Sequence, residues 1–430
     1  MISPLQRKLV RDLWGRKGSL IALLVIIAIG VGAYVGVASV WRDLDGARRD
    51  YYRAQRLAHF VVDLKRLPQW AVVESAALPN IDVLQGRVRQ AVLMELPGVE
   101  RPIPGAAISM PERRRPVLND VMLRSGGWFS GEGAQEVILD HAFAAAHGLR
   151  PGDRIKVLLL DRQHELLIVG TAQSPEFVYL IPPDGGFAPD PARYGVLYAP
   201  EDFLRESGDL QGAWNQLIGT LHDDSPTAVA SSLMLLADRL DPYGVTLTTN
   251  MRDDPSVRYL EDELVGLEVQ SRVMPVLFLG VAALVLNVLL GRLVAQQRTI
   301  IGTLRALGYP AAAVTRHYLA YGLSVGLVGG LAGVAVGGWI QVAMVDMYQD
   351  FFALPGLAPR FHPHVALVGL AISVLFAVAG TWKGVRGAAR LAPADAMRPP
   401  PPERGGRILP ERIPALWRRI PFGGRRVLRT

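Results

Sequence analysis

Residue types that catalyse reactions are sparse in this chain. Each of its five lysines follows Arg, Leu, Ile or Trp, so the sequence contains no Gly-Lys pair. The loop that cradles nucleotide phosphates needs Gly-Lys-Ser/Thr, and the sequence therefore lacks a Walker A site. The zinc signature His-Glu-x-x-His is also missing. We expect no catalytic residues and no bound cofactor, and ATP to be bound and hydrolysed by a separate partner subunit.

Two groups of histidines are candidates for metal binding. His362-Pro-His364 could hold an ion, and Asp140-His141 stands close to His147 along the chain. We interpret the first group as histidines at a membrane boundary and the second as structural residues of a surface helix. Because the chain has no cysteine, disulfides and Cys-based zinc sites are excluded. No metal site is expected.

Four stretches of the sequence are almost free of charged residues. A bilayer core of about 30 Å needs about 20 apolar residues in a helix, and each stretch is near or above that length. A buried core helix could explain one such stretch but does not account for four. The predicted membrane spans are residues 19–41, 273–294, 318–345 and 365–383.

The distribution of charge predicts the orientation in the membrane. Residues 42–271 carry a net charge of −10, and the rest of the chain carries +17. The positive-inside rule places both termini and the loop 295–317 in the cytoplasm, with residues 42–272 and the short loop 346–364 outside. We expect a multi-pass protein of the bacterial plasma (inner) membrane. The basic pI of about 9.7 then reflects topology, and no nucleic-acid partner is expected.

The two ends of the chain favour contact with lipid. Residues 1–18 place Leu5, Leu9 and Leu13 on one helical stripe, typical of an amphipathic helix on the inner membrane face. The tail 384–430 is rich in arginine and could bind anionic lipid. A disordered tail with loose attraction to the membrane is the alternative.

The region between the first and second spans is predicted to be a mixed α/β domain on two helical stalks. The stalks are expected at Arg42–Phe60 and Ser256–Arg272. The loop Ser174–Arg193 is rich in Pro, Gly and Asp, and we expect it to be exposed. Strands are predicted at Phe60–Leu64, Glu136–Leu139, Arg154–Leu160, Glu165–Gly170, Gly195–Tyr198, Gln216–Leu221 and Val245–Thr248. Helices are predicted at His141–His147, Pro200–Glu206 and Thr227–Leu240.

Small residues in the spans indicate close helix packing. Gly32-Ala-Tyr-Val-Gly36 follows the small-xxx-small pattern, and glycines recur at four-residue spacing through the third span. Asn287 is a polar residue inside the second span and could form an interhelical hydrogen bond. The predicted packing residues are Gly32, Gly36, Asn287, Gly326, Gly330, Gly333 and Gly337.

The loop between the second and third spans is the candidate binding site for a partner. It can form a short helix ending at Gly308, with Leu304 and Leu307 available to enter a groove on a cytoplasmic protein. Arg298 and Arg305 could make charge-assisted contacts to it. An ordinary interfacial helix is the alternative. The predicted docking residues are Arg298, Gly302, Thr303, Leu304, Arg305, Ala306, Leu307 and Gly308.

Gly302-Thr-Leu-Arg-Ala-Leu-Gly308 resembles the segment after the second span in the FtsX-like/MacB-type ABC transporter permease family. Ala389–Arg398 resembles the "P-A-E-A-L-R" ending of that family, and Glu136–Phe143 with Gly148–Asp153 resembles its periplasmic core module. The chain has Thr299-Ile-Ile where the family usually has an acidic residue, which puts one ion pair with the ATPase in doubt.

This resemblance implies a fold, partners and a mechanism. The fold is four transmembrane helices with a MacB-like α/β domain inserted between the first and second, and residues 273–345 with 365–398 form the FtsX-like permease domain. The implied partners are a cytoplasmic ABC ATPase, a second copy or a homologous permease, membrane lipid and an envelope adaptor or lipoprotein. ATP-driven motion would be relayed to the outer domain, by mechanotransmission, for export, extraction or efflux. The alternative function is a signalling module that regulates an envelope protein such as a cell-wall hydrolase.

Overall fold

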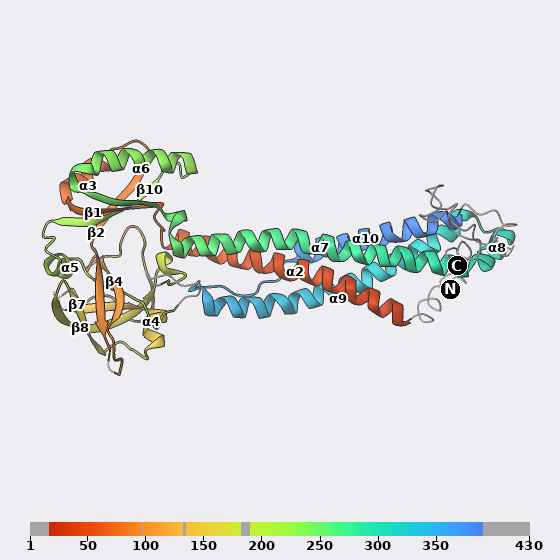
Figure 1. The fold of residues 1–430 in the computed structure, drawn as a ribbon, viewed down its shortest axis with the longest axis horizontal. Helices are drawn as coiled ribbons and strands as arrows, with labels where there is room; N and C mark the ends of the chain where they lie inside the picture. The colour runs from red at the N-terminus through yellow and green to blue at the C-terminus, as the bar shows by residue number, and fades with distance from the viewer. Residues whose placement is uncertain (1–16, 97, 132–134, 182–189, 390–430) are drawn as a thin grey trace, which may run out of the picture. The chain divides into compact units, whose positions relative to one another are not determined.

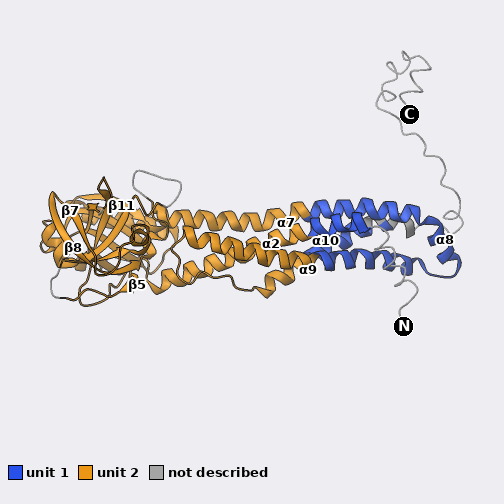
Figure 2. Ribbon diagram, turned by 90° about the horizontal axis from the view of Figure 1, so that it is seen from below, with its two compact units in different colours: residues 1–27, 279–329, 372–430 blue, residues 28–278, 330–371 orange. Residues whose placement is uncertain are grey.

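The computed structural model describes residues 17–96, 98–131, 135–181 and 190–389. The predicted amphipathic segment up to residue 16 and the tail from residue 390 lie outside the described residues. Contacts divide the chain into two compact units (Figure 2). The first unit takes the described parts of residues 1–27, 279–329 and 372–430, and the second takes 28–278 and 330–371.

Four long helices contain the predicted spans (Figure 1). They are α2 (Lys17–Ala54), α7 (Pro255–Gln296), α9 (Ala311–Phe351) and α10 (Pro363–Ala389). Each is long and apolar enough to cross a membrane. Both α7 and α10 begin with proline, whose missing N–H costs no hydrogen bond in the first turn of a helix.

The remaining helices are short. They are α3 (Gln69–Ser75), α4 (His141–Ala146), α5 (Glu201–Ser207), α6 (Pro226–Leu240) and α8 (Arg298–Ala306). Single 3₁₀ turns occur at η1 (Pro175–Phe177), η2 (Asp241–Tyr243) and η3 (Met251–Asp253). The helices predicted at 141–147, 200–206 and 227–240 are thus confirmed to within about a residue.

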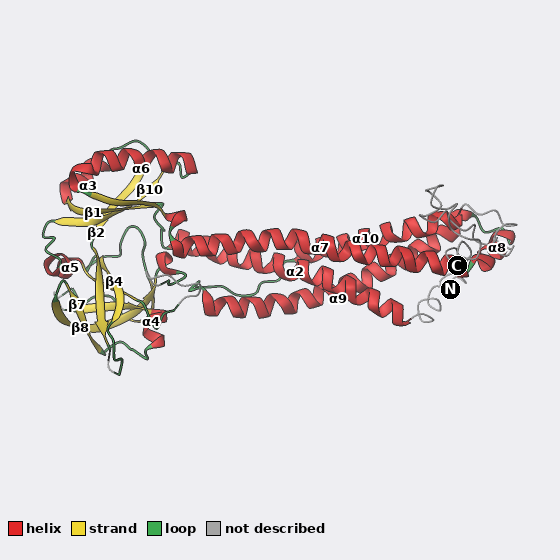
Figure 3. Cartoon of the chain, viewed as in Figure 1, coloured by secondary structure: helices red, strands yellow, loops and turns green. Residues whose placement is uncertain are grey.

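A four-stranded antiparallel sheet has the order β11-β1-β10-β2. Its strands are β1 (Phe60–Pro68), β2 (Ile81–Arg87), β10 (Ala213–Leu221) and β11 (Val245–Asn250). Helices α3 and α6 cover one face (Figure 3). Leu236 and Leu240 of α6 are completely buried, since their helical spacing points them at this sheet.

A second sheet closes on itself. It has the order β5-β8-β6-β9-β4-β3-β7, and β7 also pairs with β8. Six strands therefore form a ring with β5 added to β8, so the ring itself has no free edge. Its strands are β3 (Arg89–Glu95), β4 (Ile103–Met110), β5 (Met122–Gly126), β6 (Glu136–Asp140), β7 (Arg154–Leu159), β8 (Arg162–Gln173) and β9 (Gly195–Pro200).

Strands β2, β3, β4 and β5 were not among those predicted from the sequence. Two of them lack the alternation of apolar and polar residues that marks a half-buried strand: β4 is buried at all but one position, and β5 is almost fully exposed. The first stalk is also shorter than predicted. Helix α2 ends at Ala54, and Arg56 has φ of +50°, a left-handed conformation that no helix continues through.

The prediction that Ser174–Arg193 is exposed is wrong for its first part. Ser174, Glu176, Val178, Tyr179 and Leu180 are all buried. The proline and aspartate that suggested an exposed loop lie mostly in 182–189, outside the described residues. The segment 174–181 is buried because it packs on the beginning of α7 and the end of α9 within the second unit.

Candidate functional site

Helix α8 is held at both of its ends. The Tyr318 hydroxyl of α9 donates to Gln297 Oε1 at 2.9 Å, next to the first residue of α8. At the other end Gly308 N donates to Arg305 O and Tyr309 N to Leu304 O, both at 3.1 Å. This pair of bonds is a Schellman motif, and it needs the φ of +93° that Gly308 adopts. The helix therefore ends sharply at a fixed residue.

One face of α8 is buried and the other is exposed. Ile301 and Gly302 are buried, whereas Leu307 is 72% exposed and Ile300 is 46% exposed. Thr303 lies between these two apolar side chains at helical spacing and is exposed as well. Ile300, Thr303 and Leu307 form a ridge, which we name the α8 ridge. An apolar ridge on a fixed helix can enter a groove on another protein.

The predicted docking residues are spread over both faces of α8. Thr303, Ala306, Leu307 and Gly308 are exposed, and Leu304, Arg305 and Arg298 are half-buried. Gly302 is buried and belongs to the face turned away from solvent. Ile300 was not among the predicted docking residues, although its spacing of seven residues from Leu307 places the two on one face.

Four of the predicted packing glycines meet within the second unit, between α2 and α9. A Cβ added at Gly32 would lie 2.9 Å from Val336 Cγ1, and one at Gly36 would lie 2.8 Å from Ile340 Cγ2. From the other side, a Cβ at Gly333 or Gly337 would lie 2.5 or 2.6 Å from the Cβ of a valine of α2. The two backbones approach so closely that only glycine fits at these positions.

Of the other predicted packing residues, Gly326 and Asn287 lie in the first unit and Gly330 lies in the second. A Cβ at Gly326 would lie 2.9 Å from Ala377 of α10, and Ser373 donates a hydrogen bond to the Gly326 carbonyl. Gly330 is buried. Asn287 is half-buried, and its amide makes no hydrogen bond within the described residues. The interhelical bond expected for Asn287 is therefore not formed inside the described part of this chain.

Gly322-Leu-Ser324-Val-Gly326 fits the letters of a hydrolase nucleophile motif. That motif works at a sharp turn between a strand and a helix, which exposes the serine. Here the five residues lie inside α9, and the Ser324 hydroxyl donates to Ala320 O at 2.8 Å. The residues pack a helix and do not form a nucleophile elbow.

The histidine candidates make hydrogen bonds within the protein. His362 Nε2 lies 2.9 Å from Asp43 Oδ1, and Gln341 Nε2 donates to Asp43 Oδ2 at 2.5 Å. His141 Nδ1 lies 3.1 Å from Thr171 Oγ1, and His147 Nε2 lies 3.1 Å from Ala192 O. Within the described residues no three His, Asp or Glu side chains are arranged to hold a metal ion.

Asp140 caps helix α4. Its carboxylate accepts a hydrogen bond from Phe143 N at 3.1 Å, which is the standard role of an N-cap aspartate. Burial raises the pKa of Asp140 to about 6, even though bonds from the Phe143 and Ala142 amides favour the charged form. Asp140 is therefore easier to protonate than an exposed aspartate.

A buried ion pair fixes segment 174–181 to the four-stranded sheet. Arg87 on β2 donates to both Glu176 oxygens at 2.6 and 2.7 Å, and its Nε donates to Gln216 at 2.5 Å. Gln216 in turn donates to Asp63 at 2.5 Å. Burial alone would lower the pKa of Arg87, but the Glu176 carboxylate outweighs that effect and raises it. The Glu176 carboxylate thereby supplies the counter-charge that the buried Arg87 guanidinium needs.

The same segment also contacts the long helices. Tyr179 N donates to Ser256 Oγ at the start of α7 at 3.0 Å, and its ring stacks on Tyr259 at 4.8 Å. Ala353 N, just after α9, donates to Val178 O at 2.8 Å. Segment 174–181 thus joins the four-stranded sheet to two helices within the second unit. No periodic pattern of residues indicates this role, because the partners of the segment lie far away along the chain.

These features define a class of protein: a chain with four helices able to span a membrane and a mixed α/β domain inserted between the first and second. Residues 272–393 match the family model of the FtsX-like permease C-terminal domain. The resemblance to FtsX-like permeases is thereby confirmed for this part of the chain. Permeases of this type are the membrane subunits of ABC transporters, in which the cytoplasmic ATPase is a separate subunit.

Two solved structures are among those similar to this chain. The periplasmic region of MacB from Actinobacillus actinomycetemcomitans is 12% identical and has a TM-score of 0.30, covering 50% of this chain and 97% of the MacB region. The extracellular domain of the noncanonic ABC-type transporter YknZ from Gram-positive bacteria is 12% identical and has a TM-score of 0.27, covering 44% of this chain and 100% of that domain. No curated protein matches the sequence.

Proposed function

We propose that this chain is the permease subunit of an ABC-type complex in the inner membrane of a bacterium. The observation that carries the proposal is the α8 ridge, which lies inside the region that matches FtsX-like permeases. Its exposed apolar residues, Ile300 and Leu307, are suited to a groove on a partner ATPase. ATP is bound and hydrolysed by that partner.

The charge of the chain supports this orientation. The loop that contains α8 is basic, and the inserted α/β domain lies in the segment with net charge −10. By the positive-inside rule α8 faces the cytoplasm and the α/β domain lies outside, with both termini in the cytoplasm.

Segment 174–181 supports a mechanical role for the outer domain. Its backbone and side chains bind the beginning of α7 and the end of α9, and its Glu176 binds the four-stranded sheet. A shift of either helix would therefore move the sheet as well, because close-packed and fully bonded contacts transmit displacement. We infer that motion driven by the ATPase reaches the α/β domain through this segment, for export, extraction or efflux.

Exposed valines on α7 support association with a second permease. Val265 is 59% exposed and Val269 is 53% exposed, and both lie in the stalk before the predicted span that starts at residue 273. Apolar side chains at this position are outside the lipid and gain stability by packing against another protein. The partner is a second copy of this chain or a homologous permease.

The docking proposal is tested by replacing an apolar residue of the α8 ridge with a charge. Leu307→Asp should abolish co-purification of ATPase activity with the full chain from native membranes, because a carboxylate cannot be buried in an apolar groove. Leu160→Asp is a matched control, since Leu160 is 60% exposed but lies in the α/β domain. It should leave the complex intact.

Two outcomes would contradict the proposal. If no nucleotide-hydrolysing subunit accompanies the unmodified chain, the permease function is wrong and a membrane receptor with an outer α/β domain remains. If an ATPase accompanies both variants equally, the chain has the proposed partner but the α8 ridge does not bind it.

The association proposal is tested by cysteine cross-linking, which is clean because the chain has no cysteine of its own. Val269→Cys should form a disulfide-linked dimer in oxidised native membranes. Gln270→Cys is the control, because Gln270 is exposed but points about 100° away around the helix. Equal cross-linking of both variants would indicate random collisions.

A further inference from the structure

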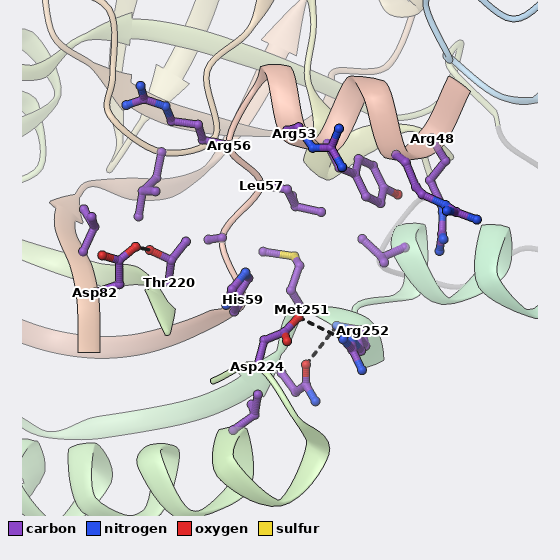
Figure 4. A pocket seen from close by; sticks show the side chains of 18 of the residues that line it. Arg48, Arg53, Arg56, Leu57, His59, Asp82, Thr220, Asp224, Met251 and Arg252 are labelled. Atoms are coloured by element: carbon purple, nitrogen blue, oxygen red, sulfur yellow. Dashed lines mark hydrogen bonds and ion pairs between the residues drawn. The ribbon is translucent and has the colours of Figure 1, made fainter. Parts of the chain in front are cut away.

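A cavity of about 570 Å³ lies within the second unit, where α2 ends beside the four-stranded sheet (Figure 4). One wall is the segment from Arg48 to His59, and the opposite wall comes from β2, β10, α6 and η3. Figure 4 shows His59 of the first wall near Met251 of the opposite wall. The volume falls in the range of about 300–1,000 Å³ that is typical of small-molecule sites.

The acidic residues of the cavity already have partners. Asp82 accepts a hydrogen bond from Thr220 Oγ1 at 3.1 Å, and Asp224 pairs with Arg252 at 3.2 Å. Glu261 pairs with Arg48. Asp224 and Glu261 are therefore paired with arginines of the protein itself, whereas the hydrogen bond to Asp82 comes from a neutral hydroxyl and does not offset its charge.

Several donors that line the cavity have no partner. Arg53 and Arg56 are exposed and form no ion pair with any residue that the structure describes. The Tyr52 hydroxyl is buried and has no hydrogen-bond partner in the described parts of the chain. Buried hydroxyls are nearly always bonded, so the Tyr52 hydroxyl in the wall of this cavity is a donor that an acceptor could satisfy.

His59 adds a further donor. Its Nδ1 accepts a hydrogen bond from Leu221 N at 3.1 Å, and burial lowers the pKa of the ring. The neutral imidazole then carries its proton on Nε2. The cavity thus offers donors from Arg53, Arg56 and His59, and two of these groups are cationic.

The backbone that carries the rim arginines is held in place. Arg56 has φ of +50°, and its carbonyl accepts a hydrogen bond from Asn119 N at 3.0 Å. The Asn119 side chain also accepts from Ala58 N at 2.6 Å. A strained residue fixed from outside its own segment is a feature that functional sites often show.

Much of the remaining lining is apolar. Leu118, Val229 and Met251 are each 3% exposed, and Leu57 and Val83 lie beside them. We propose that this cavity binds an organic anion with an apolar body. Its carboxylate or phosphate lies at Arg53, Arg56 and the Tyr52 hydroxyl, and its body packs on Leu118, Val229 and Met251. Binding at this cavity does not depend on the permease function.

The test is a fluorescence titration. Dansylundecanoic acid is added to the full chain in nanodiscs of zwitterionic lipid, and empty nanodiscs serve as the blank. The acid should bind, and its uncharged methyl ester should bind at least tenfold more weakly. The double variant Arg53→Ala/Arg56→Ala should weaken binding of the acid at least tenfold. The control Arg150→Ala/Arg154→Ala removes the same charge from exposed positions outside the cavity and should bind as the unmodified chain does.

Two further variants test the cavity itself. Tyr52→Phe should weaken binding about fivefold, because it removes one hydrogen bond and little shape. Val83→Trp should abolish binding by filling the space, while an unchanged unfolding temperature shows that the fold is intact. Equal binding of acid and ester, or unchanged binding by the Arg53/Arg56 and Val83 variants, would overturn the proposal.

The source of the natural ligand is a separate readout. Native mass spectrometry of the chain purified from its own membranes should show a bound free fatty acid or a bound anionic phospholipid, lost together with Arg53 and Arg56. Either adduct supports the proposal and identifies the source. A neutral lipid that stays bound in the double variant would contradict it.

Discussion

Two buried contacts of the second unit use opposite chemistry. The glycine contact between α2 and α9, at residues 32–36 and 333–340, is made by glycines and branched apolar side chains and contains no charge. The contact between segment 174–181 and the four-stranded sheet depends on a buried Arg87–Glu176 pair with Gln216 and Asp63 behind it. The glycine contact tolerates only small side chains, and its stability should not depend on pH. The contact of segment 174–181 is stable only when each buried charge has its partner. Substitutions can therefore test separately the dependence on side-chain size and the dependence on charge pairing.

The largest effect is expected from breaking the buried ion pair. Glu176→Leu leaves the Arg87 guanidinium buried without a counter-charge and should lower the free energy of unfolding by about 3–5 kcal/mol. The double variant Arg87→Met/Glu176→Leu should recover most of this loss, because no unpaired charge remains. Unfolding of the full chain in detergent, followed by tryptophan fluorescence, measures both. A double variant as unstable as the single one would show that packing and not charge holds the segment.

Asp140 should make the α/β domain sensitive to pH. Its pKa is about 6 in the folded protein and 3.8 for an aspartate free of the fold, so the folded state binds the proton more tightly. The free energy of unfolding should therefore fall as pH rises from about 4 to about 6, by about 3 kcal/mol.

Asp140→Asn checks this assignment. Asparagine keeps the cap on α4 but cannot ionise, so the pH dependence between about 4 and 6 should flatten. The measurement is the unfolding midpoint of both proteins across that range. A slope that survives in the variant would assign the pH dependence to another group.

The glycine contact should respond to size and not to pH. Gly337→Ala puts a Cβ 2.6 Å from Val35 Cβ and should cost about 1–3 kcal/mol through overpacking. Gly338→Ala is the matched control, because an added Cβ there meets nothing within 4 Å. Thermal unfolding in detergent compares the two variants. Equal destabilisation would mean that helix flexibility, and not the close approach, matters.

The smallest effect is expected at the end of α8. Gly308→Ala forces a side chain onto a residue with φ of +93° and should cost about 1 kcal/mol. The change in the unfolding midpoint gives the cost directly. Gly291→Ala is the control, since Gly291 lies inside α7 with open space around it. A smaller cost at Gly308 than at Gly291 would show that the Schellman motif is not required.

The sequence determined the features that depend on local composition and period. Long apolar runs that enter lipid must form helices, because a helix satisfies its backbone hydrogen bonds internally. Glycines four residues apart, as at Gly32 and Gly36, permit close packing of helices. The end of α8 at Gly308 was predictable for the same reason, because a left-handed residue at a helix end favours glycine.

Only the tertiary structure decided the contacts between distant residues. Arg87 and Glu176 are separated by 89 positions, and neither has a pattern around it that reveals the other. The rim of the cavity depends on Asn119 holding the backbone near Arg56, and the α8 ridge depends on which face of that helix is buried. Such contacts follow from the loop closures and packing of the whole fold, and no short stretch of sequence contains that information.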